Sequence, residues 1–161
     1  MREFLPTLLL RPSTNFSSRR GTRVDLLMLH DCEGGYESPV RWFELSGSSV
    51  SAHYVVREDG SEAMQMVDLA DNVWNACTFN RRSVGVEIGG FASRGFDAPL
   101  LATCAREFAF LCDHLQIPVR HARAGVGSGI ASHKDLGPAG GGDHDSVRRP
   151  ELHAEMYLPW S

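Results

Sequence analysis

The stretch VDLLMLH, residues 24–30, is a continuous apolar run that ends in a polar residue. A strand that is covered on both faces reads as an unbroken apolar run, because neither face meets water. We therefore predict a buried central strand here. His30 stands at its end, where a side chain can project from the edge of a sheet into a cleft.

Predicted helices and strands surround this strand. Residues 38–45 open with Ser-Pro and predict a short helix, with Ser38 at its cap and Pro39 at its first position. Residues 52–57 and 62–67 flank a Glu-Asp-Gly turn and predict a β-hairpin.

The second half of the chain continues the alternation. Residues 83–88 predict another apolar strand. Asp97 predicts the cap of the longest helix, which runs to about Leu115, and Pro118 follows its end as a stop signal. Residues 129–133 predict a last short strand.

A glycine-rich loop is expected at residues 136–142, and a short helix after Pro150. Strands that alternate with helices around one hairpin predict an α/β fold, with a mixed central β-sheet flanked by α-helices. We expect a single domain over residues 1–161, with residues 1–22 as a lead-in segment.

The composition narrows the range of functions. The chain has 161 residues and a net charge of -4, which argues against a nucleic-acid partner because such proteins carry a basic face. No stretch approaches the roughly 20 apolar residues of a membrane span. The first ten residues lack the apolar core of a secretory signal, so we expect cytoplasmic synthesis without a signal peptide.

The four cysteines, at positions 32, 77, 104 and 112, form no CxxC pair. Cys104 and Cys112 fall two turns apart on one predicted helix, too far to bond each other. We predict free, buried thiols in a reducing compartment. The alternative for Cys32, two residues after His30, is a role as a zinc ligand.

Two histidines, His30 and His133, end predicted strands, and the loop after His133 delivers Asp143, His144 and Asp145. Two imidazoles and one carboxylate, with a fourth position left for water, form a common arrangement for catalytic zinc. The alternative is that both histidines are hydrogen-bonded and inert, because no short metal motif such as HExxH is present.

Other residues have two interpretations each. Glu87 is an acid inside an apolar strand, which indicates either a general base or a salt bridge to Arg81 or Arg82. His53 alternates with apolar neighbours and predicts a hydrogen-bonded core histidine or a support for the metal site. Trp74 predicts a wall of the cleft or a core aromatic.

Several blocks stand in a definite order along nearly the whole chain. They are RPSTNFS at 11–17, LLMLH at 26–30, SAHYVV at 51–56 followed by Asp59-Gly60, NRRSVGVE at 80–87, and GIASHKD at 129–135 with the glycines and aspartates after it. In this order the chain resembles the zinc-dependent N-acetylmuramoyl-L-alanine amidases, a family that includes phage amidases, cell-wall-recycling amidases and peptidoglycan recognition proteins.

The resemblance implies an amidase-like fold with Zn²⁺ as cofactor. It implies His30 and His133 as zinc ligands and Glu87 as the catalytic glutamate. The third ligand is the aspartate after the glycine-rich loop. Family members with a Gly-Gly-Gly loop point to Asp145, which we favour, and members with a shorter loop point to Asp143.

The chain departs from the family around the predicted metal. Two residues before the ligand aspartate, where the family often has Lys or His, stands Asp143, so His144 becomes the candidate donor to the oxyanion. The usual Trp-His-Ala-Gly block reads WNAC at residues 74–77. The residues that we expect to contact the substrate are Trp74, Asn75 and Arg82.

The resemblance thus predicts hydrolysis of the amide bond between N-acetylmuramic acid and L-alanine. The expected partners are bacterial peptidoglycan or muropeptides, and we expect a monomer. An endolysin that acts on the cell wall after release is the first biological interpretation, and a cytosolic muropeptide-recycling amidase is the second. The departures near the metal keep a third open, a non-catalytic peptidoglycan-binding recognition domain.

Overall fold

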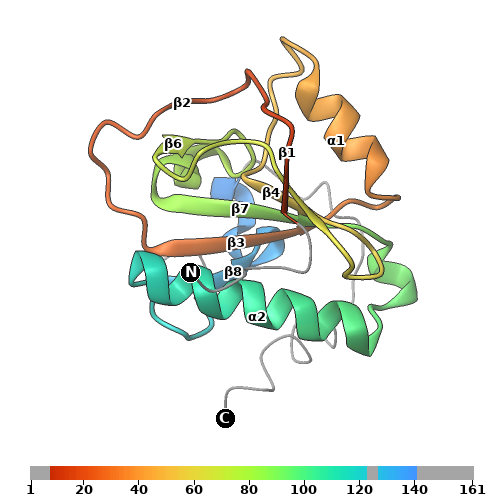
Figure 1. The fold of residues 1–161 in the computed structure, drawn as a ribbon. Helices are drawn as coiled ribbons and strands as arrows, with labels where there is room; N and C mark the ends of the chain where they lie inside the picture. Colours follow the sequence, from red (N-terminus) through yellow and green to blue (C-terminus); the bar gives the residue numbers. More distant parts are fainter. Residues whose placement is uncertain (1–7, 123–126, 141–161) are drawn as a thin grey trace.

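The computed structural model describes residues 8–122 and 127–140. Within them a six-stranded mixed sheet has the order β1-β5-β4-β7-β3-β8. Its strands are β1 (Leu8–Leu10), β3 (Leu26–Asp31), β4 (Tyr54–Val56), β5 (Ala63–Gln65), β7 (Ser83–Ile88) and β8 (Gly129–Ser132). Two helices, α1 (Glu37–Glu44) and α2 (Ala98–Leu115), lie on opposite sides of the sheet (Figure 1). The α/β class predicted from the sequence is confirmed.

Short elements complete the fold. A two-stranded antiparallel ribbon and three 3₁₀ helices connect the main elements. They are β2 (Ser17–Ser18), β6 (Asp71–Asn72), η1 (Cys77–Arg82), η2 (Ala92–Arg94) and η3 (His133–Gly140).

Strand β3 lies inside the sheet, next to the edge strand β8, and is buried as predicted, although it starts at Leu26 and not at residue 24. It pairs in parallel with β7 on one side and with β8 on the other, and β7 pairs in parallel with β4. The hairpin partner β5 is antiparallel to β4. The carboxyl ends of β3, β4, β7 and β8 therefore meet at one edge of the sheet.

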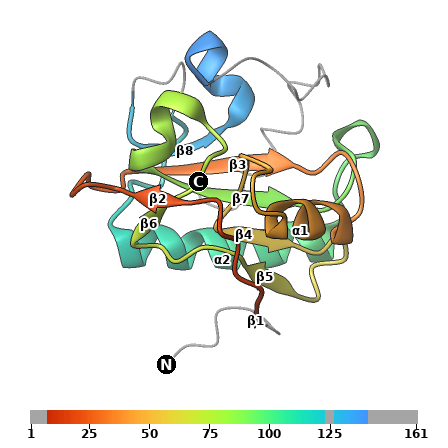
Figure 2. The same cartoon turned by 90° about the horizontal axis from the view of Figure 1, so that it is seen from above.

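The two faces of the sheet carry different layers (Figure 2). Alternate residues of β3 and β7, including Leu27, Leu29 and Val86, lie in one apolar cluster with the buried side of α2. On the other face, Val55 of β4 packs against Val40 of α1 in a second cluster. The opposite-facing residues of β3 thus point away from α2, and His30 is one of them.

Helix α2 has the start and end that the sequence predicted. The Asp97 side chain accepts a hydrogen bond from the Leu100 backbone N–H at 3.0 Å, which satisfies one of the free donors of the first turn. Gln116 ends the helix in the left-handed conformation, with φ 56°.

The start of α1 differs from the prediction. The helix begins at Glu37, so Ser38 lies inside the first turn and does not cap it. Tyr36 already has helical backbone angles, and its N–H donates to the Glu58 carboxylate at 3.2 Å. A carboxylate from a distant turn therefore takes the place of a local serine cap.

The predicted lead-in loop contains ordered contacts. The Asn15 side chain donates to the carbonyls of Phe43 and Leu45, at 3.0 and 2.9 Å, and ties the lead-in to the end of α1. Ser17 and Ser18 form β2, which pairs with β6. Such two-residue strands carry no periodic signal in a sequence.

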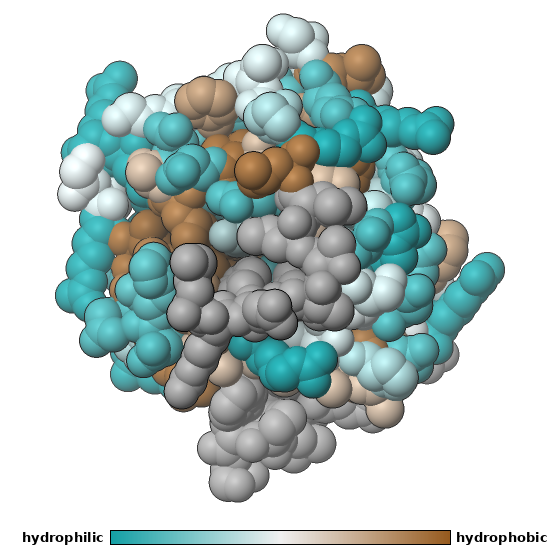
Figure 3. Space-filling view, in the orientation of Figure 1, coloured by the Kyte–Doolittle hydropathy of each residue, from teal (hydrophilic) through white to brown (hydrophobic). Residues whose placement is uncertain are grey.

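Hydrophilic residues dominate the face seen in Figure 3, with hydrophobic residues gathered in smaller patches between them. In the part of the chain that the structure describes, no helix is long and apolar enough to cross a membrane. None of the four cysteines forms a disulfide, as predicted; Cys104 and Cys112 are buried as predicted, whereas Cys77 is exposed and Cys32 is half-buried.

Glu107 is a buried acid that the sequence pattern did not reveal. It lies on the inner side of α2 with 0% exposure, and neither carboxylate oxygen has a hydrogen-bond partner among the described residues. Burial raises the pKa of Glu107 to about 8 because the charged form loses its hydration. The folded protein therefore holds this carboxyl group in its neutral form at pH 7.

This group makes stability fall as the pH rises. Between pH 4.5, the ordinary pKa, and about 8, the unfolded chain releases the proton that the folded chain keeps. Up to pH 7 the loss is roughly 2 to 3 kcal/mol. The test compares the free energies of unfolding of Glu107→Gln and wild type in urea at pH 5 and at pH 7. From pH 5 to pH 7, the stability of Glu107→Gln relative to wild type is expected to rise by this amount.

Asp113→Asn, an exposed change on the same helix, is the matched control and is expected to leave the pH dependence as in wild type. A difference between Glu107→Gln and wild type that does not change with pH contradicts the prediction.

Candidate metal and catalytic site

The candidate site lies at the edge of the sheet where β3 and β7 end. Within these neighbouring parallel strands, His30 and Glu87 are direct register partners. Partners in register project to the same face of a sheet. Two candidate site residues that are far apart in the sequence are therefore brought together.

His30 is buried, with 7% exposure, and its Nε2 atom has no hydrogen-bond partner among the described residues. Burial, and then the neighbouring His133, lower the pKa of His30 to about 3. The ring is therefore neutral at physiological pH, the form in which an imidazole can offer a lone pair to a metal ion.

His133 lies beside His30. The two rings meet edge to face, with 4.7 Å between their centroids. His133 is the first residue of η3, directly after β8, which is one residue shorter than predicted. The end of β8 thus delivers the second imidazole to the same place as the first.

The backbone turn at His133 is held by Asp135. Its carboxylate accepts hydrogen bonds from the Ser132 backbone N–H at 2.8 Å and from the Ser132 hydroxyl at 2.9 Å. His121 Nε2 lies 3.0 Å from the same oxygen. Burial alone would raise the pKa of Asp135, but the bonds from His121 and Ser132 lower it overall, so an ionised carboxylate fixes the start of η3.

The two imidazoles fit part of a zinc site. An unpartnered, buried imidazole nitrogen needs an explanation, and a metal ion or a water is the usual one. Over residues 8–122 and 127–140, no group of three or more His, Cys, Asp or Glu side chains is placed to hold a metal. The predicted third ligand Asp145, its alternative Asp143, and His144 all lie outside the described residues.

Glu87 is half-buried, and the Cys32 thiol lies 4.0 Å from its Oε2 atom. The alternative role of Glu87 is a salt bridge to Arg81 or Arg82, and of these Arg82 is bound to a different carboxylate. The Arg82 guanidinium donates two hydrogen bonds to the Asp25 carboxylate, at 2.7 and 2.8 Å. The Cys32 thiol thus lies next to Glu87, the predicted general base.

Arg82 lies at the other end of the sheet from the candidate site. Arg82 and Asp25 directly precede β7 and β3, whose carboxyl ends carry Glu87 and His30. A strand of this length separates its ends by roughly 16 Å. The structure therefore does not bring Arg82 together with the residues predicted to act beside it, and assigns it to a structural ion pair.

Asn75 lies over β7 on the face that carries Glu87. Its amide is so close to Gly85 that a Cβ atom added to this glycine would come within 1.8 Å of Asn75 Nδ2. Both amide atoms are buried without a hydrogen-bond partner among the described residues. The amide lies over Gly85, which is two residues before Glu87 on β7. Its unpaired donor and acceptor therefore keep Asn75 a candidate for substrate contact.

Trp74 is half-buried and turned toward the ribbon. Its indole N–H donates to the Ser17 hydroxyl at 3.2 Å, and its backbone N–H donates to Ser51 at 3.1 Å. These bonds place Trp74 against β2.

His53 and Arg19 form a buried network that the sequence predicted only in part. His53 has 0% exposure, and its Nδ1 accepts a hydrogen bond from the Gly85 backbone N–H at 3.0 Å. Its Nε2 lies 2.8 Å from Arg19 Nη2. Burial, and then the Arg19 charge, lower the pKa of His53 to about 3. His53 is thus a neutral core histidine that fixes the strand carrying Glu87.

The position of Arg19 in this network was not predicted. Its guanidinium is buried, with 5% exposure, and donates to the carbonyls of Leu69 and Arg81 at 2.9 and 2.7 Å. An arginine in a Ser- and Arg-rich lead-in reads as a surface residue, and no local signal distinguishes it from its neighbour Arg20.

Comparison with known proteins decides the family. The model of the family described as N-acetylmuramoyl-L-alanine amidase matches residues 20–146. The chain belongs to the N-acetylmuramoyl-L-alanine amidase family. This confirms the resemblance stated from the sequence, and the matched range contains His30, Glu87, His133 and Asp145.

A curated relative from this family is N-acetylmuramoyl-L-alanine amidase A of Achromobacter lyticus. It is 27% identical over 117 residues, which cover 71% of this chain and 66% of the relative. The match thus spans just under two thirds of the relative's length.

Solved structures share the amidase fold. The AmiA hydrolase of Staphylococcus aureus superimposes with a TM-score of 0.71, at 16% identity, over 96% of this chain and 84% of AmiA. An AmpD derivative gives 0.68 at 19% identity, over 92% and 93% of the two chains. The endolysin LysCS of Clostridium intestinale gives 0.64 at 15% identity, over 94% and 96%. The amidase-like fold is confirmed.

Proposed function

We propose that this chain hydrolyses the amide bond between N-acetylmuramic acid and the L-alanine of the peptidoglycan stem peptide. The observation that carries the proposal is the buried, unpartnered Nε2 of His30, which lies beside His133 and opposite Glu87. Family membership and the curated relative from Achromobacter lyticus support the choice of substrate.

The proposed cofactor is Zn²⁺, held by His30, His133 and Asp145. When bound, zinc activates a water molecule and polarises a carbonyl group. The neutral state of His30 suits this role, because a protonated imidazole cannot bind a cation.

Glu87 is the proposed general base. Its position opposite His30 on the same face of the sheet lets it accept a proton from the attacking water. The water oxygen adds to the muramoyl carbonyl carbon, the C–N bond breaks, and Glu87 passes the proton to the leaving L-alanine nitrogen. His144 is the proposed donor to the oxyanion, and Trp74 and Asn75 are the proposed substrate contacts.

The first experiment measures zinc content and amine release from purified peptidoglycan sacculi, for wild type and for Asp143→Ala and Asp145→Ala. We expect about one zinc ion per chain, loss of turnover with a chelator, and loss of zinc with Asp145→Ala alone. A protein without zinc and turnover that still binds muropeptides is instead a recognition domain.

We further propose an endolysin-like role, in which the protein acts on the cell wall after release from the cytosol. The similarity to the LysCS endolysin supports this role. An endolysin hydrolyses intact sacculi, whereas a muropeptide-recycling amidase prefers soluble muropeptides, so the two rates measured side by side separate the roles.

A further inference from the structure

Exposed arginines gather at the amino edge of the sheet, where β7, β3 and β8 begin. These three strands are parallel neighbours, so the segments that precede them meet at this edge, with roughly 5 Å from one strand to the next. In Figure 1 the edge lies at the left, beside the end of α2. The exposed arginines of these segments are Arg20, Arg23, Arg81 and Arg120.

Arg20 and Arg81 lie in adjoining segments. Arg19, the neighbour of Arg20, donates a hydrogen bond to the Arg81 carbonyl at 2.7 Å. The Asp25 N–H in turn donates to the Arg82 carbonyl at 3.0 Å, so the lead-in to β3 runs beside the end of η1. The exposed guanidinium groups of these two segments therefore belong to the same part of the surface.

Arg23 and Arg120 extend this surface toward β8. Arg23 Nη2 donates to the Gln116 carbonyl at 3.4 Å, at the end of α2. A little further along the chain, the Arg120 carbonyl accepts a hydrogen bond from the Ile130 N–H of β8 at 2.8 Å. The four arginines are therefore parts of one surface, the amino edge, which runs from the start of β7 across β3 to β8.

The positive charge of the amino edge is not neutralised by acids within the described residues. None of the four arginines takes part in an ion pair in this part of the chain, and neither does Asp113, an exposed acid near the end of α2. The Arg120 guanidinium donates instead to the Ser128 carbonyl and hydroxyl, both at 2.9 Å, which orient it and leave its charge in place. Arg82, by contrast, is paired with Asp25 at 2.7 Å. In a chain of net charge -4, the amino edge is thus a local excess of positive charge.

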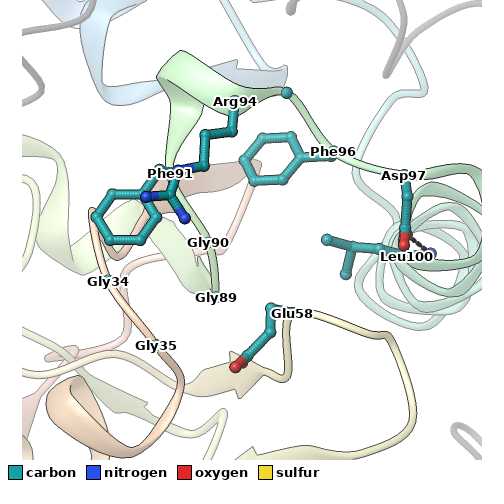
Figure 4. Close-up of a pocket in the computed structure, with 11 residues that line it drawn as sticks. Gly34, Gly35, Glu58, Gly89, Gly90, Phe91, Arg94, Phe96, Asp97 and Leu100 are labelled. Carbon is teal, nitrogen blue, oxygen red and sulfur yellow. Dashed lines mark hydrogen bonds between the residues drawn. The ribbon is translucent and has the colours of Figure 1, made fainter.

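The opposite edge of the sheet has a different character. A pocket of about 310 Å³ opens there, beyond the carboxyl ends of β3 and β7, and both signs of charge line it (Figure 4). Glu58 lies on one side of this pocket, and Arg94 lies on the other, over the Phe91 ring. The amino edge lies a strand length, roughly 16 Å, from the candidate active site, so its arginines are not part of that site.

We propose that the amino edge binds the free carboxylates of peptide stems in polymeric peptidoglycan, as a second contact outside the active site. The proposal rests on the proposed function for the identity of the polymer. A guanidinium group offers parallel N–H donors that match the two oxygens of a carboxylate. Because an exposed ion pair is weak by itself, several arginines on one surface are needed for a useful contact.

This contact distinguishes polymeric from soluble substrates. A soluble muropeptide with one stem places that stem in the active site, so its carboxylates are not available to an edge roughly 16 Å away. In a sacculus, neighbouring stems that are not being cut supply further carboxylates on the same polymer. Once one contact has formed, the second forms at a high effective concentration and raises the overall affinity. The amino edge therefore favours the intact wall over its soluble fragments.

The test measures binding to purified sacculi by co-sedimentation, with Glu87→Gln as the parent protein so that the sacculi stay intact. The edge variant, Arg81→Gln with Arg120→Gln, is expected to bind about three- to tenfold more weakly than the parent. The control variant, Arg41→Gln with Arg106→Gln, removes the same charge from exposed positions on α1 and α2 and is expected to bind as the parent does. Because salt screens exposed charges, the difference is expected to vanish at about 1 M NaCl.

A second arm of the experiment identifies the anion. On sacculi whose carboxylates have been converted to amides, the parent and the edge variant are expected to bind equally, because the groups that the arginines contact are gone. A parent that does not bind, or an edge variant that binds untreated sacculi as tightly as the control variant, overturns the proposal. So does a difference that persists on amidated sacculi, which assigns the edge to another anion, such as a phosphodiester polymer attached to the wall.

Neither arm measures turnover. Failure of the proposed function appears separately, as absence of amine release from sacculi by the wild-type protein.

Discussion

Replacement of Glu87 by alanine is expected to lower the rate of muramoyl amide hydrolysis by about 100- to 10,000-fold, the range for loss of a general base. Glu87 is register partner to His30, and Arg82 is bound by Asp25. The variant therefore leaves the Arg82–Asp25 ion pair in place, and it is expected to fold and to bind zinc as wild type does. Amine release, circular dichroism and zinc content measure the three properties.

Glu87→Gln separates the chemistry from the packing. It preserves the shape of the side chain but cannot accept a proton as a carboxylate does, and it is expected to lose as much activity as Glu87→Ala. Asp113→Asn, on the far layer of the protein, is the matched control with full activity. Retention of hydrolysis in Glu87→Gln would remove Glu87 from the mechanism.

Replacement of Arg19 by alanine is expected to lower the free energy of unfolding by about 3 to 6 kcal/mol, because two charge-assisted hydrogen bonds of about 1.5 to 3 kcal/mol each are lost. The guanidinium bridges the carbonyls of Leu69 and Arg81, across segments that are distant in the sequence, and lies beside the His53 ring. Its loss leaves buried acceptors without donors. Urea unfolding at constant pH measures the effect.

Arg23→Ala is the matched control, because Arg23 is exposed and makes one 3.4 Å bond to the Gln116 carbonyl. Its cost is expected to stay within about 0.5 kcal/mol. Arg19→Lys keeps the charge but cannot reach every partner at once, so an intermediate loss is expected. An Arg19→Ala protein as stable as the Arg23→Ala protein would show that the network contributes nothing.

The main elements of the fold could be predicted because their signals are local. The apolar run at residues 83–88 gave the bounds of β7, and Asp97 with Pro118 framed α2, since burial and capping act within a few residues. The ribbon of β2 and β6 could not be predicted, because two-residue strands owe their existence to partners far along the chain.

The site was predictable where position in a strand was enough. His30 and Glu87 end neighbouring parallel strands, so their meeting follows from the strand pattern. The same reasoning could have excluded Arg82, because a residue at the start of β7 cannot share an edge with one near its end. The ion pair of Arg82 with Asp25 could not be predicted, because it depends on the pairing of β3 with β7, which a single sequence does not show.

Glu107 illustrates a signal that was present but unused. Leu100, Cys104, Phe108 and Leu111 define the inner side of α2, and position 107 falls on the same side by helical spacing. Because acids normally lie on the protein surface, the residue type outweighed the helical spacing, and Glu107 was not predicted to be buried. The absence of any hydrogen-bond partner among the described residues is visible only in the structure.

The parallel pairing of β3 with β7 has a consequence for folding kinetics. His30 and Glu87 are joined through a long connection that contains α1, the β4–β5 hairpin and η1. Contacts between distant parts of a chain form late and slowly, because the intervening loop must first be closed at an entropic cost. His30 and Glu87, the proposed zinc ligand and general base, meet only when β3 has paired with β7, so a partly folded chain is expected to lack amidase activity.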